Sequence, residues 1–264
     1  MSYRGAVLDV DGTVVRSDEP IPGAAEGLAA LSAAGIRRLF VSNNPTKPPA
    51  AYVDRLGRAG FSVTAEEVVT SGTVTTAYLR ENHPDATVYL VGDPGLREQF
   101  LDAGVTVVGE PTDVEAVDVA VVSVDRRFDY ERLTEALSVL SDDGVAFIGT
   151  DPDVTIPTAD GLIPGSGAII HAVSGVVGRT PDRVLGKPSA TARRMVLDRL
   201  GVPPEECLVV GDRLDTDIAL GERAGMTTVL VRTGVTDERA SARSEIQPDH
   251  VLDSVAEIGR VIEG

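Results

Sequence analysis

The chain of 264 residues is long enough for one large α/β domain, or for a core domain with a second, smaller unit. Its formal net charge of -17 argues against a nucleic-acid partner, because binding to a phosphate backbone needs a basic face. The sequence has no apolar stretch of membrane-spanning length and no signal-peptide pattern, and its single cysteine, Cys207, excludes internal disulfides. We therefore expect a cytoplasmic protein without a membrane partner.

The acidity of the chain has two explanations that the sequence leaves open. Lys47 and Lys187 are the only lysines, and all other basic residues are arginine. Dispersed acidic charge with little lysine resembles the halophile-like composition of proteins from salt-loving organisms, in which salt screens the repulsion between carboxylates. Ordinary acidity combined with GC-rich codon usage predicts the same composition.

The first part of the chain alternates between strand-like and helix-like segments. Short apolar runs bounded by turn residues predict strands, and longer segments that end at Gly or Pro predict helices. The expected strands cover residues 4–9 and 38–41, and the expected helices cover residues 22–34, 48–59 and 72–81. His83 and Pro84 break the last of these helices.

A separate alternation begins near residue 87, and the first pattern resumes after residue 184. In the middle block, the expected strands cover 87–91, 105–108, 117–124 and 145–149, and the expected helices cover 94–103, 130–140 and 166–177. In the last part, the expected helices cover 189–200, 215–224 and 253–262, and the expected strands cover 207–210 and 227–231. Such alternation predicts an α/β fold of parallel sheets covered by helices. We expect a core domain of residues 1–82 and 182–264 and an inserted α/β cap domain of residues 83–181.

Two carboxylates lie at the end of the first expected strand. Asp9 and Asp11 point to the same side of an extended chain, and Gly12 allows a turn directly after them. Two carboxylates held this close repel each other unless a cation or a proton lies between them. One can then act as a nucleophile and magnesium ligand, and the other as a general acid and base. An EF-hand loop is excluded, because its glycine would fall at Val14 and its last glutamate at Pro20.

Three further segments carry polar residues that suit the same chemistry. Ser42, Asn43 and Asn44 end an expected strand and can donate hydrogen bonds to phosphate oxygens. Lys187 stands directly before an expected helix, and several acidic residues within 212–217 follow a buried strand. Ligand sites in open α/β sheets lie at the carboxyl ends of strands, so the four segments are expected to converge there. Taken singly, each segment is also consistent with a turn, a surface charge or a helix cap.

Together these segments resemble a known family. The motifs DVDGT at 9–13, SNN at 42–44, GKP at 186–188 and GDRLDTD at 211–217 look like the four motifs of the haloacid dehalogenase (HAD) superfamily. The GDRLDTD form, and the long insertion between the second and third motifs, resemble its NagD-like and p-nitrophenylphosphatase-like subfamily (IIA). The resemblance covers essentially the whole chain. It implies a Rossmann-like parallel-sheet core with an inserted, smaller α/β cap.

The resemblance also implies a function. It implies a Mg²⁺-dependent phosphatase that hydrolyses small phosphomonoesters, such as sugar or polyol phosphates, through an aspartyl-phosphate intermediate, with p-nitrophenyl phosphate as an artificial substrate. The implied partner is thus a small phosphorylated metabolite. Related phosphatases often pair through their caps, so a homodimer through the cap is implied as well. The alternative is a non-catalytic phosphate-sensing or interaction protein that retained the fold.

The resemblance assigns a role to each motif residue. The implied catalytic residues are the nucleophile Asp9, the acid and base Asp11, and Lys187. The residues implied to bind phosphate are Gly12, Ser42, Asn43, Asn44 and Lys187. The residues implied to hold Mg²⁺ are Asp9, Asp11 through its backbone carbonyl, Asp212, and Asp217 through water or supporting contacts.

Substrate choice is expected to lie in the cap, because the core motifs recognise only the phosphate that all candidate substrates share. The expected contacts lie in residues 150–156 and 161–167, whose Pro and Gly content predicts ordered loops rather than helix or strand. If Asp151 or Asp153 binds substrate hydroxyls, sugar or polyol phosphates are favoured. A capped structural turn explains these two residues equally well.

Two other patterns predict no site. Cys207 and Arg213 have the C-x5-R spacing of cysteine-dependent phosphatases, but residues 208–210 read as a buried strand, so we expect a buried, apolar Cys207. His83, His171 and His250 are too scattered for a zinc motif.

Overall fold

The computed structural model describes residues 3–108, 117–158 and 161–264, and the chain divides into two compact units. The first unit comprises residues 1–42, 49–69 and 187–264, and the second comprises 43–48 and 70–186. Helix α3 (Ser71–Asn82), which the expected boundary at residue 83 left in the core domain, thus belongs to the second unit. The reason is close packing within that unit, where Gly72 of α3 lies against Gln99 of helix α4 (Pro94–Asp102).

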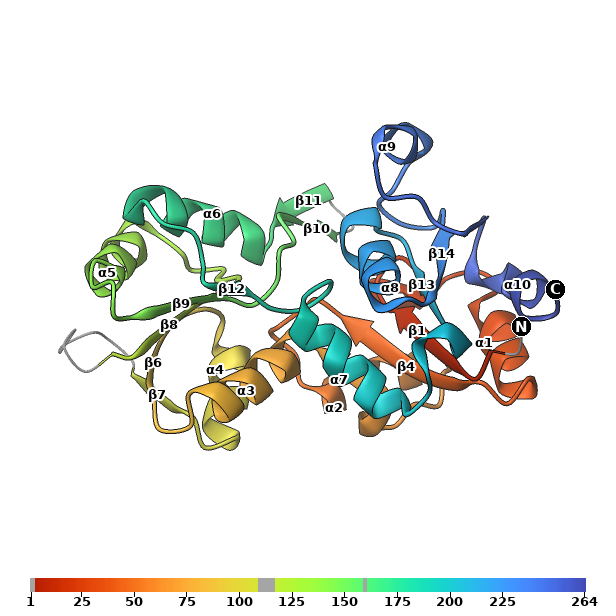
Figure 1. The fold of residues 1–264 in the computed structure, drawn as a ribbon, viewed down its shortest axis with the longest axis horizontal. Coiled ribbons are helices and arrows are strands. Elements are labelled where there is room, and N and C mark those ends of the chain that lie inside the picture. The colour runs from red at the N-terminus through yellow and green to blue at the C-terminus, as the bar shows by residue number, and fades with distance from the viewer. Residues whose placement is uncertain (1–2, 109–116, 159–160) are drawn as a thin grey trace. The chain divides into compact units, whose positions relative to one another are not determined.

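The first unit is built on a sheet in which strand β1 (Gly5–Asp9) lies between two parallel neighbours. The strand order is β15-β14-β13-β1-β4-β5. The bounds are β4 Arg37–Ser42, β5 Val68–Thr70, β13 Cys207–Gly211, β14 Thr227–Val231 and β15 His250–Leu252. Val7 of β1 lies opposite Leu39 on one side and Val209 on the other. This register places the carboxyl ends of β1, β4 and β13 side by side at one edge of the sheet (Figure 1).

Helices cover both faces of this sheet. They are α1 Ala24–Ala33, α2 Pro49–Arg58, α7 Ala190–Leu200, α8 Ala219–Ala224 and α10 Gly259–Ile262. A further helix of this unit, α9 (Glu238–Arg243), stands off from the sheet (Figure 1). Leu8 of β1 joins a buried core with Leu28 of α1 and Leu56 of α2, because alternate strand residues point to the same face. On α8, a Cβ at Gly221 would come within 2.2 Å of Val209 Cγ1, so glycine lets this helix lie directly on β13.

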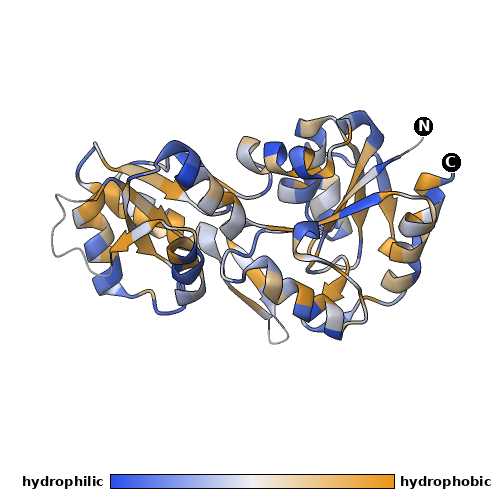
Figure 2. Ribbon diagram, turned by 90° about the horizontal axis from the view of Figure 1, so that it is seen from below, coloured by the Kyte–Doolittle hydropathy of each residue, from blue (hydrophilic) through white to orange (hydrophobic). Residues whose placement is uncertain are grey.

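The second unit has its own parallel sheet, with the strand order β12-β9-β8-β6-β7. The bounds are β6 Thr87–Val91, β7 Thr106–Val108, β8 Val119–Val122, β9 Ala146–Gly149 and β12 Arg183–Val184. Helices α5 (Tyr130–Leu140) and α6 (Ser166–Val177) pack on this sheet through a buried cluster that includes Tyr89, Phe147 and Val173. Figure 2 shows hydrophobic residues concentrated on the strands of each sheet and hydrophilic residues on the outer helix surfaces.

Short elements account for most differences from the expected pattern. The expectation of loops at 150–156 and 161–167 is wrong in part, because β10 (Thr155–Thr158) pairs with β11 (Gly161–Pro164) as an antiparallel hairpin. A second hairpin, formed by β2 (Val15–Arg16) and β3 (Glu19–Pro20), was not expected. The short strands β5 and β15 were not expected either.

Two expected helices are each divided in the structure. The helix expected at 215–224 is a π-helical turn, η4 (Leu214–Ile218), followed by α8. The helix expected at 253–262 is a 3-10 turn, η5 (Val255–Glu257), followed by α10. Two further 3-10 turns are η1 (Ala65–Glu67) and η3 (Pro204–Glu206). The predicted α/β class with parallel sheets is confirmed, and no helix in the described part of the chain is long and apolar enough to cross a membrane.

Candidate active site

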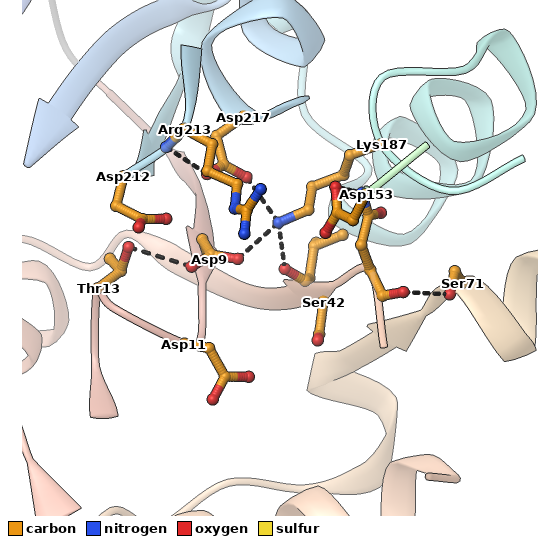
Figure 3. A network of polar contacts seen from close by, with 12 residues as sticks. Asp9, Asp11, Thr13, Ser42, Ser71, Asp153, Lys187, Asp212, Arg213 and Asp217 are labelled. Atoms are coloured by element: carbon orange, nitrogen blue, oxygen red, sulfur yellow. Dashed lines mark hydrogen bonds and ion pairs between the residues drawn. The ribbon is translucent and has the colours of Figure 1, made fainter. Parts of the chain in front are cut away.

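Lys187 lies between two carboxylates at the carboxyl edge of the first sheet (Figure 3). Its Nζ atom donates to Asp9 Oδ1 at 2.6 Å, to Asp217 Oδ1 at 2.6 Å and to the backbone oxygen of Val41 at 2.8 Å. These three acceptors match the three donors of an ammonium group. The side chain is 3% exposed, so the positive charge of Lys187 acts on Asp9 with little screening by water.

Two carboxylates follow strand β13, Asp217 and a third one at this site, Asp212. Asp212 comes directly after the strand and accepts the N–H of Val235 at 2.6 Å, and Asp217 in η4 accepts the N–H of Arg213 at 3.1 Å. One oxygen from each of Asp9, Asp212 and Asp217 lies within 4.8 Å of the other two. We call these three residues the acidic cluster. Carboxylate oxygens at this spacing are the donor set that a hard divalent cation prefers.

Burial and the neighbouring charges shift the pKa values of Asp9, Asp212 and Lys187. Burial raises the pKa of Asp9 well above its usual value, Lys187 opposes that shift, and the charges of Asp217 and Asp212 reinforce it. Burial and the charge of Asp217 raise the pKa of Asp212 to about 7. Burial disfavours the ammonium of Lys187, but the carboxylates of Asp217 and Asp9 outweigh this effect and raise its pKa. One lysine therefore does not neutralise the three carboxylates, and a divalent cation fits the charge that remains.

Asp11 is held apart from the acidic cluster (Figure 3). Its carboxylate pairs with the guanidinium of Arg55 on α2, with Nη2 at 2.6 Å from Oδ1 and Nη1 at 3.2 Å from Oδ2. One turn earlier on the same helix, the hydroxyl of Tyr52 lies 2.9 Å from the hydroxyl of Ser42 at the end of β4. Helix α2 thus contacts two of the residues that the sequence predicts to act on substrate.

Gly12 and Thr13 shape the turn after β1. Gly12 has a φ of 93°, and a Cβ at this position would lie 2.8 Å from Asp212 Oδ2. Its N–H donates to the backbone oxygen of Val15, which stabilises the turn, and the expected contact of Gly12 with phosphate stays a prediction. Thr13 is fully buried and donates its hydroxyl to Asp9 Oδ2 at 3.2 Å.

The two asparagines of the second motif belong to the second unit. Asn43 donates through Nδ2 to Asp153 Oδ1 at 3.2 Å, and Asn44 Oδ1 accepts from the N–H and the hydroxyl of Thr46. In the same unit, Asp151 is buried and accepts from the Thr150 hydroxyl and from the N–H of Asp153. These contacts of Asn44 and Asp151 are with residues one or two positions away, and such local hydrogen bonds are typical of ordered turns.

Arg55, Tyr52 and Thr13 were not predicted from the sequence. Helix α2 carries buried apolar side chains at Tyr52 and Leu56, and Arg55 falls on the same face of the helix. A charged residue on an otherwise apolar face was the signal that could have identified Arg55, because a buried guanidinium needs a partner. Cys207 is buried at the start of β13, as predicted.

Comparisons with known proteins identify the family. A sequence profile described as haloacid dehalogenase-like hydrolase matches residues 6–106, and a second HAD-hydrolase-like profile matches residues 184–258. The acid sugar phosphatase of Staphylococcus epidermidis is 38% identical over 248 residues, which cover 94% of this chain and 93% of that protein. The chain belongs to the haloacid dehalogenase-like hydrolases.

Two further relatives of this HAD-like hydrolase agree with the assignment. The 5′-nucleotidase YutF of Bacillus subtilis is 34% identical over 256 residues, with 97% of each chain covered. The structure of a p-nitrophenyl phosphatase from Archaeoglobus fulgidus has a TM-score of 0.91 and 35% identity, and the match covers 99% of this chain and 100% of that one. This chain is thus a phosphoric monoester hydrolase.

Proposed function

We propose that the protein is a Mg²⁺-dependent phosphatase that hydrolyses small sugar or polyol phosphomonoesters through an aspartyl-phosphate formed on Asp9. The observation that carries the proposal is the position of Asp9, which is buried at a strand end between the ammonium of Lys187 and two further carboxylates. An anionic nucleophile can approach a phosphate only after positive groups neutralise the charge of both. Lys187 supplies part of that neutralisation.

The acidic cluster fits Mg²⁺ by the chemistry of its donors. Asp9 and Asp212 would hold the ion together with the backbone carbonyl of Asp11, and Asp217 would support the site through its contacts with Lys187 and the N–H of Arg213. When bound, Mg²⁺ withdraws charge from the phosphate oxygens and thereby makes the phosphorus more open to attack.

The proposed reaction has two steps. A carboxylate oxygen of Asp9 attacks the phosphorus, the bond from phosphorus to the leaving oxygen breaks, and Asp11 transfers its proton to that oxygen. In the second step Asp11 takes a proton from water, the water oxygen attacks the phosphorus, and the bond from phosphorus to Asp9 breaks. Inorganic phosphate leaves, and both aspartates return to their starting states. The hydroxyl of Ser42 and the ammonium of Lys187 are proposed to bind the phosphate oxygens in both steps.

Relatives of two kinds bear on the substrate. The acid sugar phosphatase supports a sugar or polyol phosphate, and the 5′-nucleotidase supports a nucleotide as the competing class. We favour the former, because the sugar phosphatase has the higher identity. The assignment of substrate choice to residues 150–156 and 161–167 stays a prediction.

The test is release of phosphate by the purified protein from p-nitrophenyl phosphate and from a panel of sugar, polyol and nucleotide monophosphates. We expect turnover with Mg²⁺, its loss in EDTA, and a higher kcat/KM for sugar or polyol phosphates than for nucleotides. Asp9→Asn keeps the size of the side chain but removes the nucleophile, so it should remove nearly all turnover while leaving the circular dichroism spectrum unchanged. Appreciable activity in a well-folded Asp9→Asn protein, free of deamidation, would rule out the aspartyl-phosphate.

A further inference from the structure

We propose that Arg55 is a positioning residue that holds the carboxylate of Asp11 in place for proton transfer. The inference rests on the proposed role of Asp11 as general acid and base. It assigns a function to a residue of α2 that lies outside the four motifs.

The pair has the geometry of a bidentate clamp. Nη2 of Arg55 lies 2.6 Å from Asp11 Oδ1, and Nη1 lies 3.2 Å from Oδ2. Two parallel hydrogen bonds fix the rotation of a carboxylate as well as its position, which a single contact does not. The clamp therefore limits Asp11 to one orientation.

The two partners differ sharply in burial. The side chain of Arg55 is 8% exposed, whereas that of Asp11 is 40% exposed. The guanidinium thus approaches from the protein interior and leaves the opposite side of the carboxylate open. A carboxylate has about four lone-pair sites, of which the clamp occupies two, so the others remain available to carry the proton.

Arg55 is itself immobilised by other contacts. Its Nε atom donates to the backbone oxygen of Ser17 at 3.0 Å and lies 3.3 Å from Asp18 Oδ1. Its neighbours on the buried face of α2, Tyr52 and Leu56, are fully buried. A rigid partner is what a positioning role requires, because proton transfer depends on the acid staying within hydrogen-bond reach of the leaving oxygen.

A purely structural role is the competing explanation, because the same guanidinium ties the turn of the β2–β3 hairpin to α2. The two roles differ in their dependence on the leaving group. Phenyl phosphate and p-nitrophenyl phosphate have similar shapes, but phenol is the weaker acid, so its departing oxygen depends more on a proton from Asp11. Loss of a positioned acid should therefore harm phenyl phosphate more, whereas a structural defect should harm both substrates equally.

The experiment measures kcat/KM of Arg55→Gln with both substrates at saturating Mg²⁺. We expect the ratio of kcat/KM for p-nitrophenyl phosphate to that for phenyl phosphate to rise by at least about tenfold over wild type, since positioned acids and bases contribute roughly 10²- to 10⁴-fold. Arg55→Lys keeps the charge but not the bidentate geometry, so it should give an intermediate ratio. If Arg55→Gln folds poorly, the same ratio of kcat/KM values measured for Arg55→Lys still tests the proposal.

Two controls lie on the same helix. Arg58→Gln removes an exposed charge from α2 and should leave the ratio at the wild-type value. Tyr52→Phe removes the hydroxyl that contacts Ser42, and its effect should fall equally on both substrates because they share the same phosphate.

Asp11→Asn separates failure of the inference from failure of the proposed function. If Asp11→Asn raises the ratio and both Arg55 variants leave it unchanged or lower it, the positioning role of Arg55 is overturned while the role of Asp11 stands. If Asp11→Asn itself leaves the ratio unchanged, the acid role of Asp11 fails, and this inference fails with it.

Discussion

At the level of single residues, Lys187 and its two carboxylate partners form a buried, charge-assisted network. Breaking a buried pair leaves an uncompensated charge, which is strongly destabilising, whereas the intact pair contributes little net stability after desolvation. Selection for stability alone therefore does not explain two ion pairs on one lysine that is 3% exposed. The proposed phosphate chemistry does, because the ammonium stands beside Asp9, the proposed nucleophile, and can contact an anion that binds there.

The first prediction concerns the contribution of Asp212 to Mg²⁺ binding. Asp212→Asn removes a charged oxygen from the acidic cluster, so it should raise the Mg²⁺ concentration needed for half-maximal activity by at least about tenfold. The melting temperature supplies a second measurement, because an ion that binds only the native state raises it with concentration.

The control for this variant is Asp215→Asn. It removes an equal charge from the adjacent turn η4, but Asp215 is exposed and is not one of the three residues of the acidic cluster. Equal Mg²⁺ dependence in the two variants would count against a metal-binding role for Asp212.

At the level of elements, the loops at the carboxyl ends of parallel strands gather polar residues in both units. The loop after β9 carries Asp151, which is 2% exposed and accepts hydrogen bonds from Thr150 and Asp153. Burial raises the pKa of Asp151 to about 8, and the charge of Asp153 adds to the shift. An aspartate in this state is protonated and neutral at mildly acidic pH.

The second prediction follows from this pKa. An unfolded aspartate titrates near pH 4, so between about pH 4 and 8 the native state binds the additional proton. The stabilisation from Asp151 is therefore fully present below about pH 4 and is lost as the pH rises through 8. Asp151→Asn removes this dependence. As the pH rises from about 4 to 8, the free energy of unfolding of the variant should therefore increase relative to that of wild type by up to about 1.4 kcal/mol per pH unit.

The measurement is denaturant unfolding of both proteins at several pH values between 5 and 8. The difference between the two proteins cancels the contributions of the other titrating groups. Parallel stability profiles would show that Asp151 titrates in the folded protein as it does in the unfolded chain.

At the level of the whole molecule, acidic residues outnumber basic ones by 41 to 24. Some exposed charges are paired, such as Arg4 with Glu206 and Arg260 with Glu257, but exposed pairs of this kind contribute little stability. The net repulsion of the excess carboxylates therefore dominates the surface electrostatics.

The third prediction is that the melting temperature rises as KCl increases from 0.05 to 1 M. The Debye length falls from about 10 Å at 0.1 M to about 3 Å at 1 M, so most of the gain should come at the lower end of that range. A steady rise up to 1 M would instead indicate exclusion of salt from the surface. An unchanged melting temperature would favour the codon-usage explanation of the composition.

The homodimer through the cap stays a prediction, for which sedimentation at several protein concentrations is the measurement.

The sequence by itself determined the α/β class and the family, and it predicted most residues of the candidate site, because these depend on local properties. Strand periodicity and the polar residues at strand ends are readable within a few positions, and they identified Asp9, Lys187 and Asp212. The clamp of Arg55 on Asp11 was decided only by the tertiary structure, because it joins residues 44 positions apart through the packing of α2. The β10–β11 hairpin and the place of α3 in the second unit were decided in the same way, because pairing partners and close packing are properties of the folded chain rather than of any single segment.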